Sequence, residues 1–162
     1  MRHFMSAFVL AAALTSSPVF AQGAPSAGVV MSIASSREVA DLIAQAKAEI
    51  KEGQNVLTKR VTSLAPFSSN LEYRVGPGPT MQHEKDAELF VVLDGTATLT
   101  MGGKLVNEKR LNPENLSGSG AEGGTTKAFG KGDILIIPPN TPHSFTITNG
   151  PLVMVSVHFV LK

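Results

Sequence analysis

Two stretches of the sequence decide the fold: MQHEKDAELFVVLDG at residues 81–95 and GDILIIPPNTPHSFTITN at residues 132–149. Apolar and polar residues alternate over residues 143–148, which is the period-two pattern of a β-strand with one buried face. By the same period, Met81 and His83 share one face, and so do Glu88, Phe90 and Val92. His143 falls in step with Phe145 and Ile147, on the apolar face that should point inward. An imidazole on such a face needs a hydrogen-bond partner or a metal, because burying it unpaired costs free energy.

The rest of the sequence after residue 55 also has the pattern of β-strands. From Val56 onward, short β-branched runs alternate with Gly, Pro and Asn, which is typical of a β-sandwich or barrel. Tight turns are predicted at Asp94-Gly95, Gly102-Gly103 and Asn149-Gly150, and Gly102-Gly103 should join the two strands of a hairpin. The sequence therefore predicts an all-β domain at residues 55–162.

One segment interrupts this rhythm. Residues 112–125 (NPENLSGSGAEGGT) are rich in Gly, Ser and Asn, which predicts a mobile surface loop. Long loops are often functional, so a lid over the barrel mouth and a tolerated insertion are both open interpretations.

The first opening stretch resembles the first sequence motif of the cupin superfamily. That motif has a glycine-rich approach, His-x-His, a Glu after three or four residues and a Gly six residues further on. The corresponding segments here are Gly76-Pro77-Gly78-Pro79, Met81-x-His83, Glu88 and Gly95. Met81 therefore stands where the family usually has its first histidine.

The second stretch is similar to the second cupin motif, which runs Gly, five residues, Pro-x-Gly, two residues, His. The matching residues are Gly132, Pro138, Asn140 and His143. Asn140 replaces a turn glycine, a mild change because Asn tolerates the left-handed conformation that such a turn requires. The resemblance covers roughly residues 65–160.

The resemblance implies a double-stranded β-helix (jelly-roll, cupin) barrel and a metal site held by His83, Glu88 and His143. Two histidines and one carboxylate suit a divalent ion such as Fe, Mn, Ni, Zn or Cu, whereas the Met81 thioether is a poor ligand for hard ions. The alternative is a metal-free barrel in which both histidines hydrogen-bond Glu88 or buried water.

Two further groups near these residues are interpreted structurally. His158 lies on the last apolar strand without motif spacing, so we interpret it as a core or edge residue outside the site. Glu84, Lys85 and Asp86 form a charged cluster that is typical of a solvated turn, although Asp86 could be a spare oxygen donor.

The N-terminal third has a different organisation. Residues 1–21 combine Arg2, an apolar run and a small-residue end, which predicts a signal peptide cleaved after Ala21 and hence a periplasmic or secreted protein. Residues 22–34 are small and poorly patterned, which predicts a flexible leader. A helix is predicted at 35–53, with a Ser35/Glu38 capping box and Gly53 as the C-cap glycine. Its apolar stripe should pack on the barrel exterior or on a second subunit, which leaves a homodimer open.

Composition excludes several classes of function. Removing residues 1–21 leaves 13 basic and 13 acidic residues, so the mature chain has no electrostatic footprint for nucleic acid or anionic lipid. We expect no membrane association after cleavage. Cysteine is absent, which excludes thiolate catalysis, thiolate ligands and disulfides.

Three classes of function fit this domain. The metal site would suit oxygen-dependent cleavage, isomerisation or lyase chemistry on a small organic molecule. The same barrel could instead bind a small ligand without turnover, or serve as a structural assembly module. The cupin resemblance does not choose among them, because that fold hosts many activities.

Overall fold

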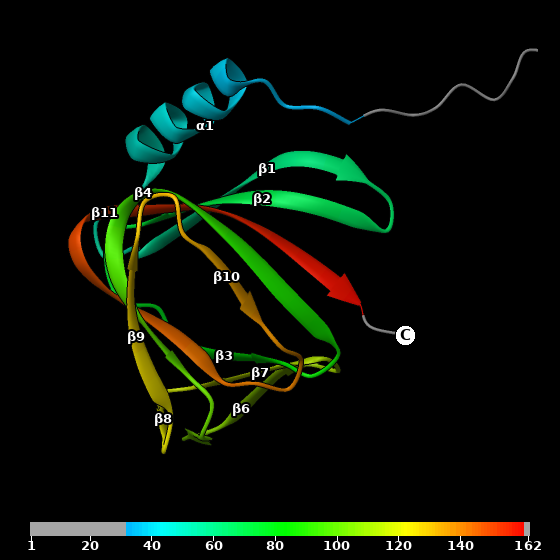
Figure 1. The fold of residues 1–162 in the computed structure, drawn as a ribbon, viewed down its shortest axis with the longest axis vertical. Coiled ribbons are helices and arrows are strands. Elements are labelled where there is room, and N and C mark those ends of the chain that lie inside the picture. The colour runs from blue at the N-terminus through cyan, green and yellow to red at the C-terminus, as the bar shows by residue number, and fades with distance from the viewer. Residues whose placement is uncertain (1–31, 161–162) are drawn as a thin grey trace, which may run out of the picture.

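Two long strands, β4 (Asp86–Met101) and β11 (His143–Val160), form the frame of the fold in the computed structural model, which describes residues 32–160. They pair antiparallel over nearly their whole length, from His143 opposite Met101 to Val160 opposite Asp86. Both strands bend sharply at the same place, on the left of Figure 1, so that the pair folds back on itself. The predicted signal peptide and most of the predicted leader lie outside the described residues.

Glycine makes the bend possible. Gly95 has a φ of 84°, and a Cβ there would lie 2.3 Å from the carbonyl oxygen of Pro151. A side chain at this position would therefore collide with the backbone of β11 as well as straining its own. Asp94-Gly95 and Asn149-Gly150 were predicted as turns between strands, and this was wrong: both lie inside continuous strands, at shifts of the β4–β11 register.

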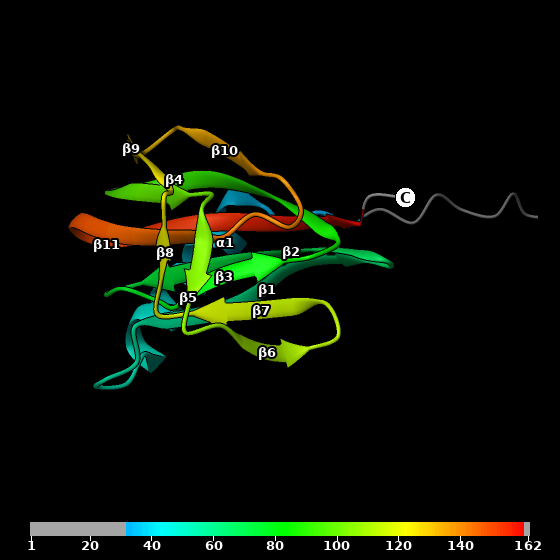
Figure 2. The same cartoon turned by 90° about the horizontal axis from the view of Figure 1, so that it is seen from below.

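All the other strands of residues 32–160 except β5 and β8 extend this pair into one folded sheet (Figure 2). β2 pairs with β1 and β11, β3 with β11 and β7, and β7 with β6, whereas β9 and β10 both pair with β4. β5 and β8 form a separate two-stranded sheet. The bounds are β1 Val56–Leu64, β2 Phe67–Arg74, β3 Thr80–His83, β5 Lys104–Val106, β6 Lys109–Asn112, β7 Asn115–Gly118, β8 Gly120–Glu122, β9 Thr125–Gly130 and β10 Ile134–Ile137.

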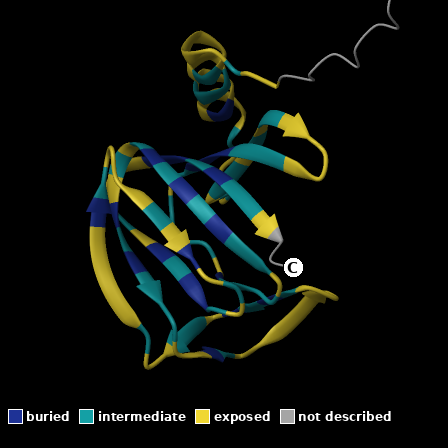
Figure 3. Cartoon of the chain, turned by 45° about the vertical axis from the view of Figure 1, so that its right-hand side comes forward, coloured by how far each residue is buried: buried dark blue, intermediate teal, exposed yellow. Residues whose placement is uncertain are grey.

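The folded sheet encloses the main hydrophobic core. Burial alternates along β4, where Glu88, Phe90 and Val92 are buried and the residues between them are half-buried (Figure 3). The buried face contributes a continuous apolar cluster: Phe90, Val92, Ala97, Leu99, Phe129, Ile137, Phe145, Leu152 and Met154. Glu88 is thus a carboxylate on the inner, apolar face of the barrel.

The helix α1 (Ser36–Glu49) covers part of the outer face. The predicted capping box is present: the Ser35 side chain accepts from the Glu38 backbone, and the Glu38 carboxylate accepts from the Ser35 backbone. Ala46 packs on Leu71, Tyr73 and Val153 of the same chain, so the apolar stripe of the helix is covered without a second subunit. Within residues 32–160, no helix has both the length and the apolar character needed to span a bilayer.

The C-terminal end of the helix differs from the prediction. Ile50, in an extended conformation, is the C-cap, and Gly53 lies beyond the helix in a turn with a φ of 77°. The apolar pattern that extended the prediction to residue 53 continues because Ile50 also packs on the sheet.

The prediction of a structureless loop at residues 112–125 was wrong. This segment forms β7, β8 and the start of β9, and Leu116 and Gly118 of β7 are buried. Small residues are required there by close packing, since a Cβ at Gly118 would lie 2.7 Å from the carbonyl oxygen of Val106. Paired backbone groups hold the strands despite their weak β propensity.

The predicted hairpin at Gly102-Gly103 was wrong for a related reason. β5 pairs with β8 and not with β4. A Cβ at Gly103 would lie 2.1 Å from the carbonyl oxygen of Glu122, so this glycine allows the chain to pass close to the end of β8.

Candidate metal centre

All three histidines within residues 32–160 face the carboxylate of Glu88. His83 ends β3, whereas His143 begins β11 and His158 lies near its end. His158 is directly opposite Glu88 in the β4–β11 ladder. Because β11 bends back on itself, its two ends reach the same side of the barrel and bring His143 and His158 to one carboxylate.

The distances within this cluster are those of ligands around one ion. The Nε2 atom of His158 lies 3.1 Å from Glu88 Oε1, and the Nε2 atoms of His143 and His83 lie 3.4 and 3.5 Å from Glu88 Oε2. Ligands about 2.1 Å from a common metal, at octahedral or tetrahedral angles, are roughly 3.0–3.4 Å apart. Ligand atoms of His83, Glu88 and His158 all lie within 4.8 Å of one another.

The second ring nitrogens orient two of these imidazoles. His83 Nδ1 lies 2.5 Å from Asn115 Oδ1, and His143 Nδ1 lies 3.0 Å from the Thr141 carbonyl oxygen. Because a carbonyl oxygen only accepts, the Nδ1 atom of His143 carries a proton, and the ring is held with its Nε2 atom toward Glu88. Hydrogen bonds of this kind orient histidine ligands in metal sites.

Glu88 itself fits a cation. It is 3% exposed, and its Oε2 atom is buried without a hydrogen-bond partner among residues 32–160. Two imidazole nitrogens face this oxygen at distances too long for strong hydrogen bonds. A buried anion facing two lone pairs is unstable unless a proton or a metal ion lies between them.

The electrostatics of the cluster keep the carboxylate ionised. Burial raises the pKa of Glu88, but contacts with His143, His158 and His83 outweigh burial and leave that pKa far below its usual range. Burial lowers the pKa of His83, and contacts with Glu88 and Asn115 outweigh that effect and raise it. Both shifts describe a carboxylate that strongly attracts positive charge.

The structure brings His83, Glu88 and His143 together, as the motif spacing predicted. The interpretation of His158 as a residue outside the site was wrong. Leu152, Met154 and Ser156 are buried and alternate in step with His158, so all four share the inner face of β11. Ser156 and His158 on an otherwise apolar face were the available signal, but the sequence did not reveal that β11 folds back to Glu88.

The two departures from the cupin motifs have clear positions. Asn140 has a φ of 55°, so it adopts the left-handed conformation expected of the missing glycine. Met81 lies opposite His143 in the β3–β11 pairing, which places both side chains on one face. Asp86 Oδ2 is 3.7 Å from His158 Nδ1, and Asp86 Oδ1 is buried without a partner in the described part of the chain.

The β6–β7 hairpin braces the ligand segment. Arg110 forms a two-pronged ion pair with Glu84, and Lys85 pairs with Glu114. The backbone nitrogen of Glu84 also donates to the Glu114 carbonyl oxygen at 2.9 Å. Together with the Asn115 contact to His83, these bonds make the β6–β7 hairpin a support for the ligand segment.

Comparison with known proteins gives the fold a name. No protein-family profile and no curated protein match the sequence. Among solved structures, the Fe(II) form of HppE matches with a TM-score of 0.50 at 16% identity, over 66% of this chain and 52% of that one. This chain has the cupin fold.

Two further solved structures match over a comparable part of this chain. The DMSP lyase DddQ from Ruegeria pomeroyi matches with a TM-score of 0.47 at 16% identity, over 65% of this chain and 47% of that one. An uncharacterized Klebsiella pneumoniae protein with a double-stranded β-helix domain matches with a TM-score of 0.48 at 17% identity, over 64% of this chain and 71% of that one. This chain spans about half the length of DddQ and HppE, and at these identities the likeness shows the fold alone.

Proposed function

We propose that this cupin binds one divalent metal ion between Glu88 and the Nε2 atoms of His83, His143 and His158. The observation that carries the proposal is the buried Glu88 Oε2, which has no hydrogen-bond partner among residues 32–160 although two imidazole nitrogens face it. With His158 included, the set becomes three histidines and one carboxylate. Nitrogen and carboxylate donors suit Fe, Mn, Ni, Zn or Cu.

The proposed activity is metal-dependent cleavage, isomerisation or elimination acting on a small organic molecule. A bound ion would supply a Lewis acid that polarises a substrate oxygen, or a binding position for O₂. The side chain of His158 is 35% exposed whereas that of His143 is 5% exposed, so a substrate would approach from the His158 side. Phe90 and Phe145 pack edge to face, and Phe145 also contacts His143, which gives the inner side of the site an apolar wall.

Metal content tests this proposal. Protein purified from its natural compartment should contain about one equivalent of a transition metal by elemental analysis. Glu88→Gln should lose that metal while keeping the fold, because the amide has nearly the same shape but no charge. Protein that carries no metal, and that binds none added after chelation, would overturn the proposal and favour a histidine–carboxylate cluster held by protons.

We also infer that the protein acts outside the cytoplasm. The basic, apolar and small-residue regions of residues 1–21 support export, followed by cleavage after Ala21. Mass spectrometry of the protein from the periplasm or medium should find Gln22 at its N-terminus. Intact Met1 in a soluble cytoplasmic fraction would contradict export.

A further inference from the structure

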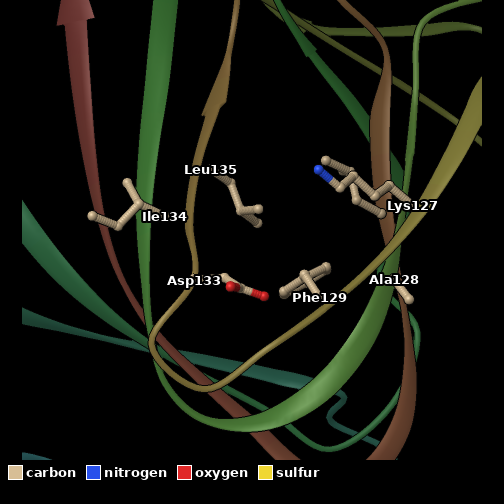
Figure 4. A pocket seen from close by; sticks show the side chains of 7 residues that line it. Lys127, Ala128, Phe129, Asp133, Ile134 and Leu135 are labelled. Atoms are coloured by element: carbon tan, nitrogen blue, oxygen red, sulfur yellow. The ribbon is translucent and has the colours of Figure 1, made fainter.

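A pocket opens on the barrel wall between β9 and β10 and has a volume of about 140 Å³ (Figure 4). β9 pairs with residues 96–101 of β4, and β10 pairs with residues 88–91. The bend of β4 at Gly95 therefore separates two strands that lie along the same edge of β4. The pocket occupies the space between them.

The inner wall of the pocket is apolar. Leu99, Phe129 and Leu135 line it, and the first two belong to the buried core. An apolar cavity of roughly 150 Å³ lined by such residues accommodates one benzene-sized molecule. The pocket therefore has room for one small ring or a short branched chain.

Two charged side chains lie at the rim of the pocket, and they differ in whether they already have a partner. Asp133 Oδ2 already accepts a hydrogen bond from the Gly130 backbone nitrogen at 2.8 Å. Lys127 lies opposite Leu99 in the β4–β9 pairing, so its side chain leaves the strand on the same face as Leu99. Lys127 is nevertheless exposed, and it forms no ion pair with any residue of the 32–160 segment. Its ammonium group is the available charge at the mouth of an apolar pocket.

The turn that closes one end of the pocket is held rigidly. The Gly132 backbone nitrogen donates to the Val92 carbonyl oxygen at 2.9 Å, and the Val92 nitrogen donates to the Asp133 carbonyl oxygen at 3.0 Å. A pocket fixed in this way loses little conformational entropy when a ligand binds.

We propose that this pocket binds a small carboxylic acid, with its compact apolar group against Leu99, Phe129 and Leu135 and its carboxylate paired with Lys127. This site is distinct from the proposed metal centre. The Phe145 ring lies between them, 5.7 Å from the Phe129 ring and 6.3 Å from the His143 ring. The proposal therefore stands or falls independently of metal binding.

The test uses benzoate, benzyl alcohol and benzylamine, each added to chelator-treated protein so that a carboxylate cannot bind a metal instead. NMR shifts of the Leu99 and Leu135 methyl groups report binding in the pocket. Benzoate should bind more tightly than the other two compounds. Lys127→Gln should weaken benzoate binding about fivefold, as expected for one partly exposed ion pair, and leave benzyl alcohol unchanged.

Two matched variants serve as controls. Leu135→Phe fills the pocket and should abolish the shifts, whereas Ile136→Phe, on the outward face of the same strand and outside the pocket lining, should not; Lys131→Gln should behave like the parent. Absence of shifts with millimolar benzoate in the folded parent protein would overturn the proposal, as would tighter binding of benzylamine. Retention of benzoate binding by a folded Leu135→Phe variant would equally overturn it.

Discussion

Replacing His158 by Ala is the sharpest test of the metal centre, because this histidine lies outside both cupin motifs. Four-ligand structural zinc sites contribute about 10–16 kcal/mol on metal binding. Divided equally among four ligands, this free energy is about 3 kcal/mol per ligand. Loss of one ligand in His158→Ala should therefore raise the Kd for the metal about 100-fold. The fold should survive, since the His158 side chain is 35% exposed and belongs to neither hydrophobic core cluster.

The consequence for stability follows by linkage. An ion present at 100 times its Kd stabilises the parent protein by about 2.7 kcal/mol, and a 100-fold weaker variant would keep only about 0.4 kcal/mol of that. Chelator competition measures the affinity, and thermal unfolding with and without metal measures the stabilisation. Phe159→Ala, on the opposite face of the same strand, is the control and should bind metal like the parent.

The outcomes separate two ligand sets. Unchanged metal affinity in His158→Ala, combined with loss in His143→Ala, would refute the role of His158 and leave a three-ligand site. Unchanged affinity in both variants would refute the site altogether.

Three further predictions concern the surroundings of the site. In metal-free protein, the raised pKa of His83 stabilises the fold at pH values below the ordinary histidine pKa of 6.5. The lowered pKa of Glu88 stabilises the fold at pH values above the ordinary glutamate pKa of 4.5. In the presence of chelator, thermal stability should therefore fall as the pH rises above 6.5. With metal present it should instead rise with pH, because ligation needs neutral imidazoles. The same pH dependence in both conditions would contradict the assignment of these residues as metal ligands. Asn115→Ala should weaken metal binding about 10- to 100-fold in the competition assay, whereas Glu114→Ala, which loses only an exposed ion pair, should not. Gly95→Ala should lower the free energy of unfolding, measured in urea, by about 2 kcal/mol or more. Gly132→Ala, where the added Cβ meets open space, should lower it by about 1 kcal/mol. Equal losses in the two variants would argue against close packing at the bend.

The sequence by itself determined the all-β class, the helix start at Ser35 and three of the four candidate ligands. These features are local: strand alternation, a capping box and motif spacing all act over a few residues. His83, Glu88 and His143 could be found because each lies in a short motif whose spacing is readable along the chain.

Tertiary structure decided the rest, because the deciding contacts join residues far apart in the sequence. Gly95 and Gly103 were predicted to lie in turns. In the structure they allow the backbone to lie close to the carbonyl oxygens of Pro151 and Glu122, which no local sequence pattern reveals. The Gly- and Ser-rich segment at 112–125 forms strands because β3 and β6 pair with β7, and Gly118 allows the close approach of the Val106 carbonyl oxygen. His158 joins the site only because β11 bends back and places it opposite Glu88, and that bend depends on packing between two strands, not on the residues beside His158.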